Sequence, residues 1–299
     1  KNPDTDTICS AIAYAELKGK LGKDVKAVRL GEVNEETKFV LDYFKVEKPE
    51  LIESVSGKEI MLVDHNERTQ TADGFEEAKV LELVDHHRIS NFNVDEPLYV
   101  RMEPVGCTAT IILKLFKENN LLPSPTTAGL MLSAIVSDTL LFKSPTCTEC
   151  DVKAGKELAE IAGVNVEEYG LEMLKAGTAL GGKSEAELIN MDMKIFEVDG
   201  SKIGVAQVNT VNEAELLERK EKLLVEINNI IKKEGLKFFI FAITNILSND
   251  STGIVAGDGN AIIEKAFNEK IDNNLIALKG IVSRKKQIIP PLTKAIQEA

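Results

Sequence analysis

The sequence predicts an α/β fold in two domains: an N-terminal domain with a doubly wound parallel sheet and a smaller C-terminal α/β domain with a mixed sheet. Three observations support this prediction. Two apolar runs, 60–63 and 80–84, are typical of buried strands. Strand and helix patterns alternate along the chain, and the alternation restarts after a glycine-rich stretch at 177–183. A chain of 299 residues is also long enough for two domains.

The N-terminal domain, expected at 1–176, begins with a polar loop in which Thr5 or Asp6 can cap the first helix. Helical spacing of apolar residues and β-branched runs predict the elements that follow. In chain order they are a helix at 7–20, a strand at 24–30, a helix at 35–44, the strands at 60–63 and 80–84, and helices at 108–119, 126–141, 150–162 and 166–176.

A short linker is expected at 177–183, because this stretch is rich in glycine, and the C-terminal domain is expected at 184–299. The same patterns recur beyond the linker. They predict strands at 202–208 and 237–244 and helices at 211–234 and 261–268.

Composition limits the functions that the chain can have. The formal net charge is −12, which argues against nonspecific nucleic-acid binding because such binding needs many basic contacts to phosphates. No apolar run reaches the roughly 18 residues of a membrane span, and no signal peptide is visible. We therefore expect a cytoplasmic protein without nucleic acid or membrane as a partner. A small anionic substrate held by a local cationic pocket stays compatible with this charge.

Two cysteines have the spacing of a redox or zinc motif. Cys147 and Cys150 are separated by two residues, but the chain offers no second pair at that spacing. In a reducing compartment, unpaired thiols in a loop are the simpler interpretation.

Both apolar runs end at an acid followed by histidine. The first leads into Asp64 and His65, and the second into Asp85, His86 and His87, which accounts for all three histidines of the chain. Ligands of open α/β sheets bind beyond the carboxyl ends of the strands. Two neighbouring strands that deliver Asp and His to one edge predict a metal site, whereas ordinary surface or core histidines are the simpler possibility.

Three more acids are candidates for this site. Asp138 lies in an almost wholly apolar helical run, where a buried carboxylate needs a partner that is either a cation or a capping hydrogen bond. Asp4 and Asp6 are two residues apart in an extended loop, so they can point the same way, or they can simply face the helix dipole.

The candidate set mixes carboxylates with one imidazole. Such converging acids repel one another unless divalent cations neutralise them, and this donor mixture suits manganese, cobalt or zinc better than calcium. The candidate ligands are Asp4, Asp6, Asp64, His86 and Asp138.

A basic run at 283–287 supplies candidate anion-binding groups. Arg284 offers a planar fork and Lys285 a point charge, and both suit phosphate oxygens. A run this short is usually a solvated loop, and nothing distinguishes Lys194 by itself. In so acidic a chain with a candidate metal site, the basic run gains weight.

Five motifs in order resemble those of the family II inorganic pyrophosphatases, the manganese-dependent members of the DHH phosphoesterase superfamily. The similarity spans essentially the whole chain and identifies the N-terminal domain as DHH type. The motifs are 2–6, 63–67, 85–88, 137–138 and 283–287, and stretches 104–110 and 142–146 are similar as well.

This resemblance implies hydrolysis of inorganic pyrophosphate by a hydroxide that bridges two manganese ions, with cobalt as a possible replacement metal. It implies that Asp4 binds the first ion, that Asp64 bridges both, and that Asp6, His86 and Asp138 bind the second. It also implies a magnesium ion carried by the substrate and a homodimer formed by the N-terminal domains.

The resemblance further implies roles for residues that contact pyrophosphate. His87 would assist proton transfer, and Lys194, Arg284 and Lys285 of the C-terminal domain would grip the substrate. Asp85 and His65 receive no ligand role; we expect His65 to orient Asp64 or its surroundings and Asp85 to support the ligands in a similar way.

The family pattern places a strand and a Gly-His pair immediately before Lys1, and that histidine is a ligand of the first metal. A doubly wound sheet also calls for a strand that leads into the Asp4 loop. We therefore expect the first metal site to lack one ligand in the printed sequence, and an inactive, truncated form is one possibility.

Related enzymes with different substrates share this N-terminal chemistry. DHH phosphoesterases that cleave oligonucleotides or polyphosphate usually carry a Gly-Gly-His type motif in the C-terminal domain, which this sequence lacks. A nonenzymatic anion-binding module is a further hypothesis if the metal site is broken. A regulatory nucleotide-binding insert is not expected, because the gap between Glu67 and Ala78 is too short.

Overall fold

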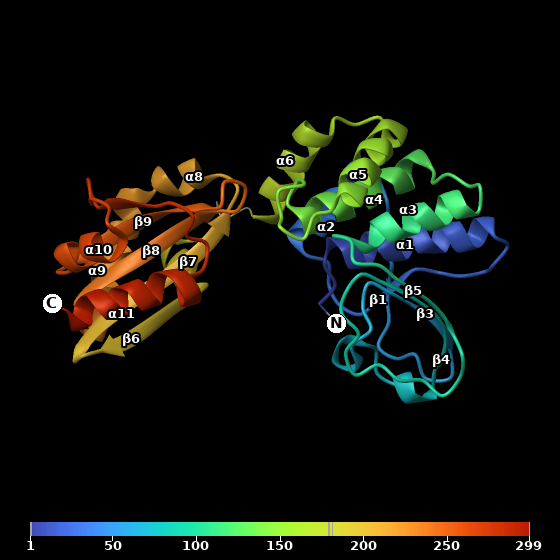
Figure 1. The fold of residues 1–299 in the computed structure, drawn as a ribbon, viewed down its shortest axis with the longest axis horizontal. Coiled ribbons are helices and arrows are strands. Elements are labelled where there is room, and N and C mark those ends of the chain that lie inside the picture. The colour runs from blue at the N-terminus through green and yellow to red at the C-terminus, as the bar shows by residue number, and fades with distance from the viewer. Residues whose placement is uncertain (1, 179, 181, 299) are drawn as a thin grey trace. The chain divides into compact units, whose positions relative to one another are not determined.

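The computed structural model describes residues 2–178, 180 and 182–298 of the chain. These residues form two compact units, Lys1–Gly177 and Thr178–Ala299, and each unit contains both helices and strands (Figure 1). The predicted α/β class is therefore confirmed.

The described strands of the first unit pair in parallel. β3 (Glu59–Val63), β4 (Lys79–Asp85) and β5 (Tyr99–Met102) form a three-stranded sheet in that order. A separate parallel pair joins β1 (Val28–Arg29) to β2 (Glu50–Leu51). Parallel N-terminal strands are thus confirmed, in two sheets.

The strand predicted at 24–30 is mostly wrong, because only Val28 and Arg29 pair with another strand. Strands β2 and β5 have no counterpart in the prediction. Strand β5 is hard to predict from the sequence. It exposes Tyr99 and Val100 to solvent and lacks the long apolar run of a buried strand.

The helices of the first unit gather beside the parallel strands (Figure 1). Each helix predicted here is confirmed, with ends within two residues of the expected positions. They are α1 (Thr5–Lys20), α2 (Glu35–Phe44), α3 (Thr108–Glu118), α4 (Pro125–Thr139), α5 (Glu149–Ala162) and α6 (Val166–Gly177), with short 3-10 turns η1 (Arg68–Gln70) and η2 (Phe75–Glu77). Nowhere in the described part of the chain is a helix long and apolar enough to cross a membrane.

Helix α4 is the central helix of this unit. The side chain of Ser124 caps its first turn, Pro125 occupies the first helical position, and the left-handed Leu140 (φ 47°) ends it. Its residues are apolar almost all round because α1, α3 and α5 pack against it. This burial fixes the last turn, which carries Asp138, with respect to α1.

A cavity of about 810 Å³ lies within the first unit. Its lining includes residues of β1, β3 and α1, together with Asp4, Asp64 and His87. The cavity therefore adjoins three of the predicted site residues.

The second unit has a five-stranded mixed sheet, as predicted for the C-terminal domain. The strand order is β10-β9-β8-β7-β6, with β7 and β8 parallel and the other neighbours antiparallel. The strands are β6 (Met193–Val198), β7 (Ser201–Thr210), β8 (Phe238–Asn245), β9 (Asp250–Gly257) and β10 (Leu275–Leu278). Central strand β8 is buried along nearly its whole length, with one apolar core on each face.

Helices cover both faces of this sheet. They are α7 (Glu185–Asn190), α8 (Glu213–Leu217), α9 (Lys220–Glu234), α10 (Asn260–Phe267) and α11 (Ile289–Gln297), with a single π-helical turn η3 (Arg284–Ile288) before α11. Helices α7, α8 and α9 bury Leu188, Leu216 and Leu223 in one core, whereas α10 and α11 bury Ile263 and Leu292 in the other.

Two predictions for the second unit need correction. The single helix expected at 211–234 is interrupted between α8 and α9, where the Arg219 guanidinium reaches Glu185 and the Lys183 carbonyl. The bend lets Leu216 and Leu223 enter the same core. Strands β6, β9 and β10 have no counterpart in the prediction; β9 is rich in small and polar residues, which gives a weak strand signal.

Candidate metal centre

The ends of β3 and β4 bring acids and histidines to one sheet edge, as predicted. Val63 pairs with Val84 in parallel register, so Asp64 and the segment from Asp85 to His87 emerge side by side. Asp64 adopts a left-handed backbone conformation (φ 65°), and its N–H donates to the Val84 carbonyl at 2.9 Å. Aspartate tolerates this conformation better than most residues, and here it turns the buried carboxylate away from the strand.

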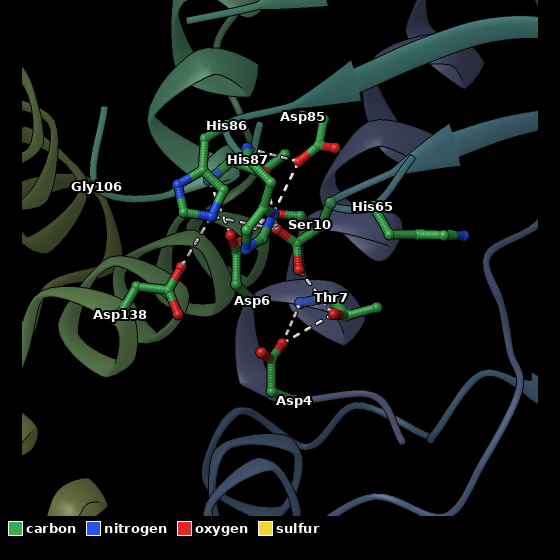
Figure 2. A network of polar contacts seen from close by, with 12 residues as sticks. Asp4, Asp6, Thr7, Ser10, His65, Asp85, His86, His87, Gly106 and Asp138 are labelled. Carbon is green, nitrogen blue, oxygen red and sulfur yellow. Dashed lines mark hydrogen bonds and ion pairs between the residues drawn. The ribbon is translucent and has the colours of Figure 1, made fainter. Parts of the chain in front are cut away.

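His86 points its free ring nitrogen at two carboxylates (Figure 2). Nδ1 lies 3.0 Å from the Val105 carbonyl, which accepts its proton. Nε2 faces Asp64 Oδ1 at 3.6 Å and Asp138 Oδ2 at 3.7 Å. A histidine whose other ring nitrogen is held by a backbone carbonyl in this way can offer Nε2 to a metal ion.

Among the described residues, the structure holds two groups of possible metal ligands: Asp64 with His86 and His87, and buried Asp6 and Cys107 with half-buried Asp138. Within each group, the donor atoms lie within 4.8 Å of one another. Asp6 accepts hydrogen bonds from the Ser10 hydroxyl and, at 2.8 Å, from the backbone N–H of Thr108. The two groups meet because His86 faces Asp138, so the structure brings together Asp6, Asp64, His86 and Asp138.

Asp4 joins this set through Thr7. Asp4 caps α1 by accepting from the Thr7 N–H at 2.9 Å. The Thr7 hydroxyl lies 2.8 Å from Asp4 Oδ1 and 2.7 Å from Asp64 Oδ2. One hydroxyl proton serves only one of these acceptors at a time, so two anionic oxygens converge on a site with too few donors.

Burial, together with charge crowding, raises the pKa of two carboxyl groups in this centre. Burial raises the pKa of Asp64 and of Asp138 well above the usual range, and the nearby carboxylates of Asp6 and Asp4 raise both further. Within the described ranges, no Lys or Arg pairs with Asp6, Asp64 or Asp138. A divalent cation would supply the missing positive charge, and carboxylates mixed with imidazole suit a borderline ion such as manganese.

The turn at residues 105–108 holds several of these groups, which sequence reasoning missed. Thr108 donates its hydroxyl to Asp64 Oδ1 at 3.0 Å, in addition to its N–H bond to Asp6. The turn is tied to α5 by the buried Asp151, which accepts from the Gly106 N–H at 2.8 Å. A Cβ on Gly106 would lie 2.9 Å from Asp151 Oδ2, so this close approach requires glycine. The Pro-Val-Gly-Cys-Thr stretch was the available signal.

His87 is held beside the metal ligands by Asp85. Asp85 Oδ1 accepts from the His87 backbone N–H at 3.0 Å and lies 2.9 Å from its Nδ1. This hydrogen bond raises the pKa of His87, whereas the same contacts, against the effect of burial, hold the pKa of Asp85 below its usual range. Asn66 donates to Asp85 at 2.6 Å and so fixes its second oxygen. Asp85 therefore orients His87, as predicted.

His65 takes no part in the cluster. Its side chain points away from the acids (Figure 2), and burial lowers its pKa. Cys147 and Cys150 are free thiols, one half-buried and one exposed.

The other predicted site residues, Lys194, Arg284 and Lys285, lie in the second unit. Arg284 is buried, and its Nη1 lies 2.8 Å from Asp192 Oδ1. Lys194 lies two residues after Asp192, and both Lys194 and Lys285 are exposed. The structure thus brings the basic turn and the start of β6 together.

The Gln207 side chain holds this basic turn, a role that sequence reasoning missed. It accepts from the Arg284 N–H at 2.9 Å and donates to the Val282 carbonyl at 2.9 Å. Arg284 Nε is buried without a hydrogen-bond partner among the described atoms, so the guanidinium keeps one unused donor.

Comparisons with known protein families agree with the division of the chain into two units. Residues 1–135 match the DHH family, N-terminal domain, and residues 171–295 match the DHHA2 domain. A protein of Exiguobacterium sp. named "Probable manganese-dependent inorganic pyrophosphatase" is 59% identical over 297 residues, covering 99% of this chain and 96% of the relative. A Bacillus cereus protein with the same name is 55% identical over 299 residues, covering 99% and 97%.

A solved structure is similar along the whole chain. It is that of a Methanococcus jannaschii protein assigned to the family II inorganic pyrophosphatases. It superposes with a TM-score of 0.62 at 43% identity and covers 99% of this chain and 97% of the other.

Proposed function

Because the chain belongs to the family of manganese-dependent inorganic pyrophosphatases, it hydrolyses inorganic pyrophosphate, and we propose that the acidic centre of its first unit is the site of that reaction. The observation that supports this site most directly is the geometry of His86. Its Nε2 faces the carboxylates of Asp64 and Asp138, and these buried and crowded acids call for divalent cations. The DHH-type cleavage of oligonucleotides or polyphosphate is not favoured.

We propose two manganese ions per subunit, with cobalt as a substitute. Asp4 and Asp64 would hold the first ion, and Asp64 would share the second with Asp6, His86 and Asp138. The hydrogen bond from Thr7 to Asp64 and the fixed tautomer of His86 support these assignments. When bound, the ions would lower the pKa of a water nucleophile and neutralise phosphoryl oxygens.

His87 is the proposed proton-transfer residue. Its hydrogen bond to Asp85 keeps the ring oriented while one face stays exposed to solvent. Because Asp85 raises the pKa of His87, the ring carries a proton more readily near neutral pH and can donate it to the leaving phosphate.

Lys194, Arg284 and Lys285 are the proposed substrate clamp. The exposed ammonium groups of Lys194 and Lys285, next to the buried guanidinium of Arg284, support this role, because a dense anion needs several positive charges and donors. Magnesium would arrive with the pyrophosphate. We infer a linker at 177–183, between domains at 1–176 and 184–299; residues 179 and 181 of this linker lie outside the described part of the chain.

We also infer a homodimer and a cytoplasmic location. The exposed Tyr99 and Val100 on edge strand β5 offer an apolar surface that a second copy of the first unit can cover. Free cysteines suit a reducing compartment. Sedimentation velocity of Tyr99→Lys against the unsubstituted protein tests the dimer: a monomeric variant supports it, and an unchanged mass contradicts it.

Phosphate release tests the proposed site. The purified protein is assayed on pyrophosphate and on a dinucleotide, with manganese, magnesium or chelator present. We expect pyrophosphate to be the better substrate, manganese to activate more than magnesium alone, and His86→Ala to abolish turnover. Equal cleavage of the dinucleotide would favour an oligonucleotide phosphoesterase, and full activity of His86→Ala would exclude this centre.

A further inference from the structure

The Glu36 carboxylate joins two segments that carry proposed metal ligands. Glu36 lies in the first turn of α2, and its Oε1 accepts from the Thr5 hydroxyl at 2.7 Å and from the Ser137 hydroxyl at 2.5 Å. Thr5 lies between Asp4 and Asp6, and Ser137 immediately precedes Asp138. A single oxygen therefore ties the start of α1 to the last turn of α4.

The hydrogen bonds of the Glu36 carboxylate come from the hydroxyl groups of Thr5 and Ser137. Across the described residues, it forms no ion pair with a Lys or Arg. Thr5 is fully buried, and its hydroxyl also lies 3.0 Å from that of Thr37, in the next position of α2. A hydrogen bond to an ionised acceptor is stronger than one between neutral groups, so this contact holds Thr5 firmly.

Helix α6 prevents the Glu36 side chain from swinging away. At Gly177, the last residue of α6, an added Cβ would lie 2.8 Å from both Cβ and Oε2 of Glu36. The glycine thus lets the two helices approach closely, and the carboxylate is wedged between α6 and the ligand-bearing segments. A side chain packed in this way has few accessible rotamers.

We propose that Glu36 is a positioning residue of the metal centre, which fixes the separation of Asp6 and Asp138 through Thr5 and Ser137. The inference rests on the proposed metal-binding function of those two acids. Crowded carboxylates do not by themselves hold the two segments at a fixed separation when no cation lies between them. Glu36 ties the segments together from behind the ligands, so the centre is already assembled when metal arrives.

The test measures manganese affinity by calorimetry, together with the thermal midpoint of the metal-free protein. Glu36→Ala should weaken manganese binding about 10–100-fold, the usual loss when a partner that orients a ligand is removed. Glu36→Gln keeps an acceptor oxygen and should restore most of the affinity. Glu35→Ala is the matched control, because Glu35 is an exposed neighbour on the same helical turn.

Two further variants approach the same contact from its other sides. Ser137→Ala removes one donor, and Gly177→Ala pushes a methyl group against the carboxylate; both should weaken manganese binding, by less than Glu36→Ala. They keep the proposal testable if Glu36→Ala does not fold.

The outcomes separate this proposal from the proposed function. Glu36→Ala with unchanged manganese affinity overturns the positioning role, even if its metal-free midpoint falls, because that result is purely structural. Unchanged affinity in both Ser137→Ala and Gly177→Ala overturns it too. If the unsubstituted protein binds no manganese, the proposed metal centre itself fails.

Discussion

The acidic centre of the first unit and the basic turn of the second unit differ in whether their buried charged side chains have ion-pair partners. In the centre, Asp6 and Asp64 are buried and accept hydrogen bonds from hydroxyl and N–H groups, yet have no Lys or Arg ion partner in the described chain. In the turn, buried Arg284 is paired with Asp192 while Lys285 stays exposed. Among the described residues, the acidic centre therefore has no Lys or Arg counter-charge, whereas the basic turn has Asp192 as the counter-charge of Arg284.

This difference indicates what each region binds. Buried carboxylates without cations are costly, so we propose that cations from solution complete the centre. The turn pairs Arg284 with Asp192 and leaves Lys285 exposed, so we propose that it binds the anionic substrate. Metal should therefore act on the first region and substrate on the second, and the following experiments can break this separation.

The largest effect is expected for Asp64, which we propose to contact both metals. Asp64→Asn should lower manganese affinity by more than about 100-fold, beyond the loss caused by removing an orienting partner, and abolish turnover. Asparagine tolerates the left-handed backbone of this position, so the fold should persist, as circular dichroism can check. Calorimetry that still finds two tightly bound manganese ions per subunit would refute the bridging role.

The basic turn should affect turnover and leave metal binding unchanged. Arg284→Ala and Lys285→Ala should each lower kcat on the order of 10²–10³-fold, because a group that stabilises transferring phosphoryl charge is lost. Lys286→Ala is the matched control, since Lys286 is an exposed neighbour in the same turn.

Near-normal kinetics of both Arg284→Ala and Lys285→Ala would refute the substrate-binding role and support the alternative that the basic run is a solvated loop. Reduced manganese affinity in either variant would refute the proposed separation of metal binding from substrate binding, because metal binding would then depend on the second unit.

Manganese should stabilise the two regions unequally. At a 100-fold excess over its dissociation constant, a ligand adds about 2.7 kcal/mol to the stability of the region it binds. Hydrogen exchange should therefore slow in α1, α4 and the strands β3 and β4, but not in β8 of the second unit. Equal slowing of exchange in both units would contradict a site confined to the first.

The smallest effect is expected for Asp192. Its pair with Arg284 is half-exposed on the Asp192 side, and such pairs contribute about 0–1 kcal/mol. Asp192→Ala should change kcat/KM for pyrophosphate by no more than about fivefold. A change as large as that of Arg284→Ala would mean that Asp192, and not the free donor of the guanidinium, governs substrate binding.

Much of the acidic centre was predictable from the sequence. The apolar runs before Asp64 and Asp85 gave two parallel strands, and parallel strands share one carboxyl edge. The apolar helix around Asp138 marked a carboxylate that needs a partner, and the structure places it 3.7 Å from His86 Nε2.

The supports of the centre were not predictable, because they depend on contacts between distant segments. Asp151 reaches Gly106 across 45 residues, and Glu36 reaches Ser137 across 101 residues. Nothing local distinguishes these acids from solvent-exposed ones in the first turn of a helix. Short strands such as β5 and β10 were missed for a related reason: pairing defines them, and periodicity does not.

Anomalous diffraction at the manganese absorption edge, from crystals soaked in manganese, locates the metal ions. We expect one peak enclosed by Asp6, Asp64, His86 and Asp138, a second between Asp4 and Asp64, and none beside Asp192 or Arg284. Manganese peaks only at other places, or none in the first unit under conditions in which the enzyme hydrolyses pyrophosphate, would refute the proposed metal centre.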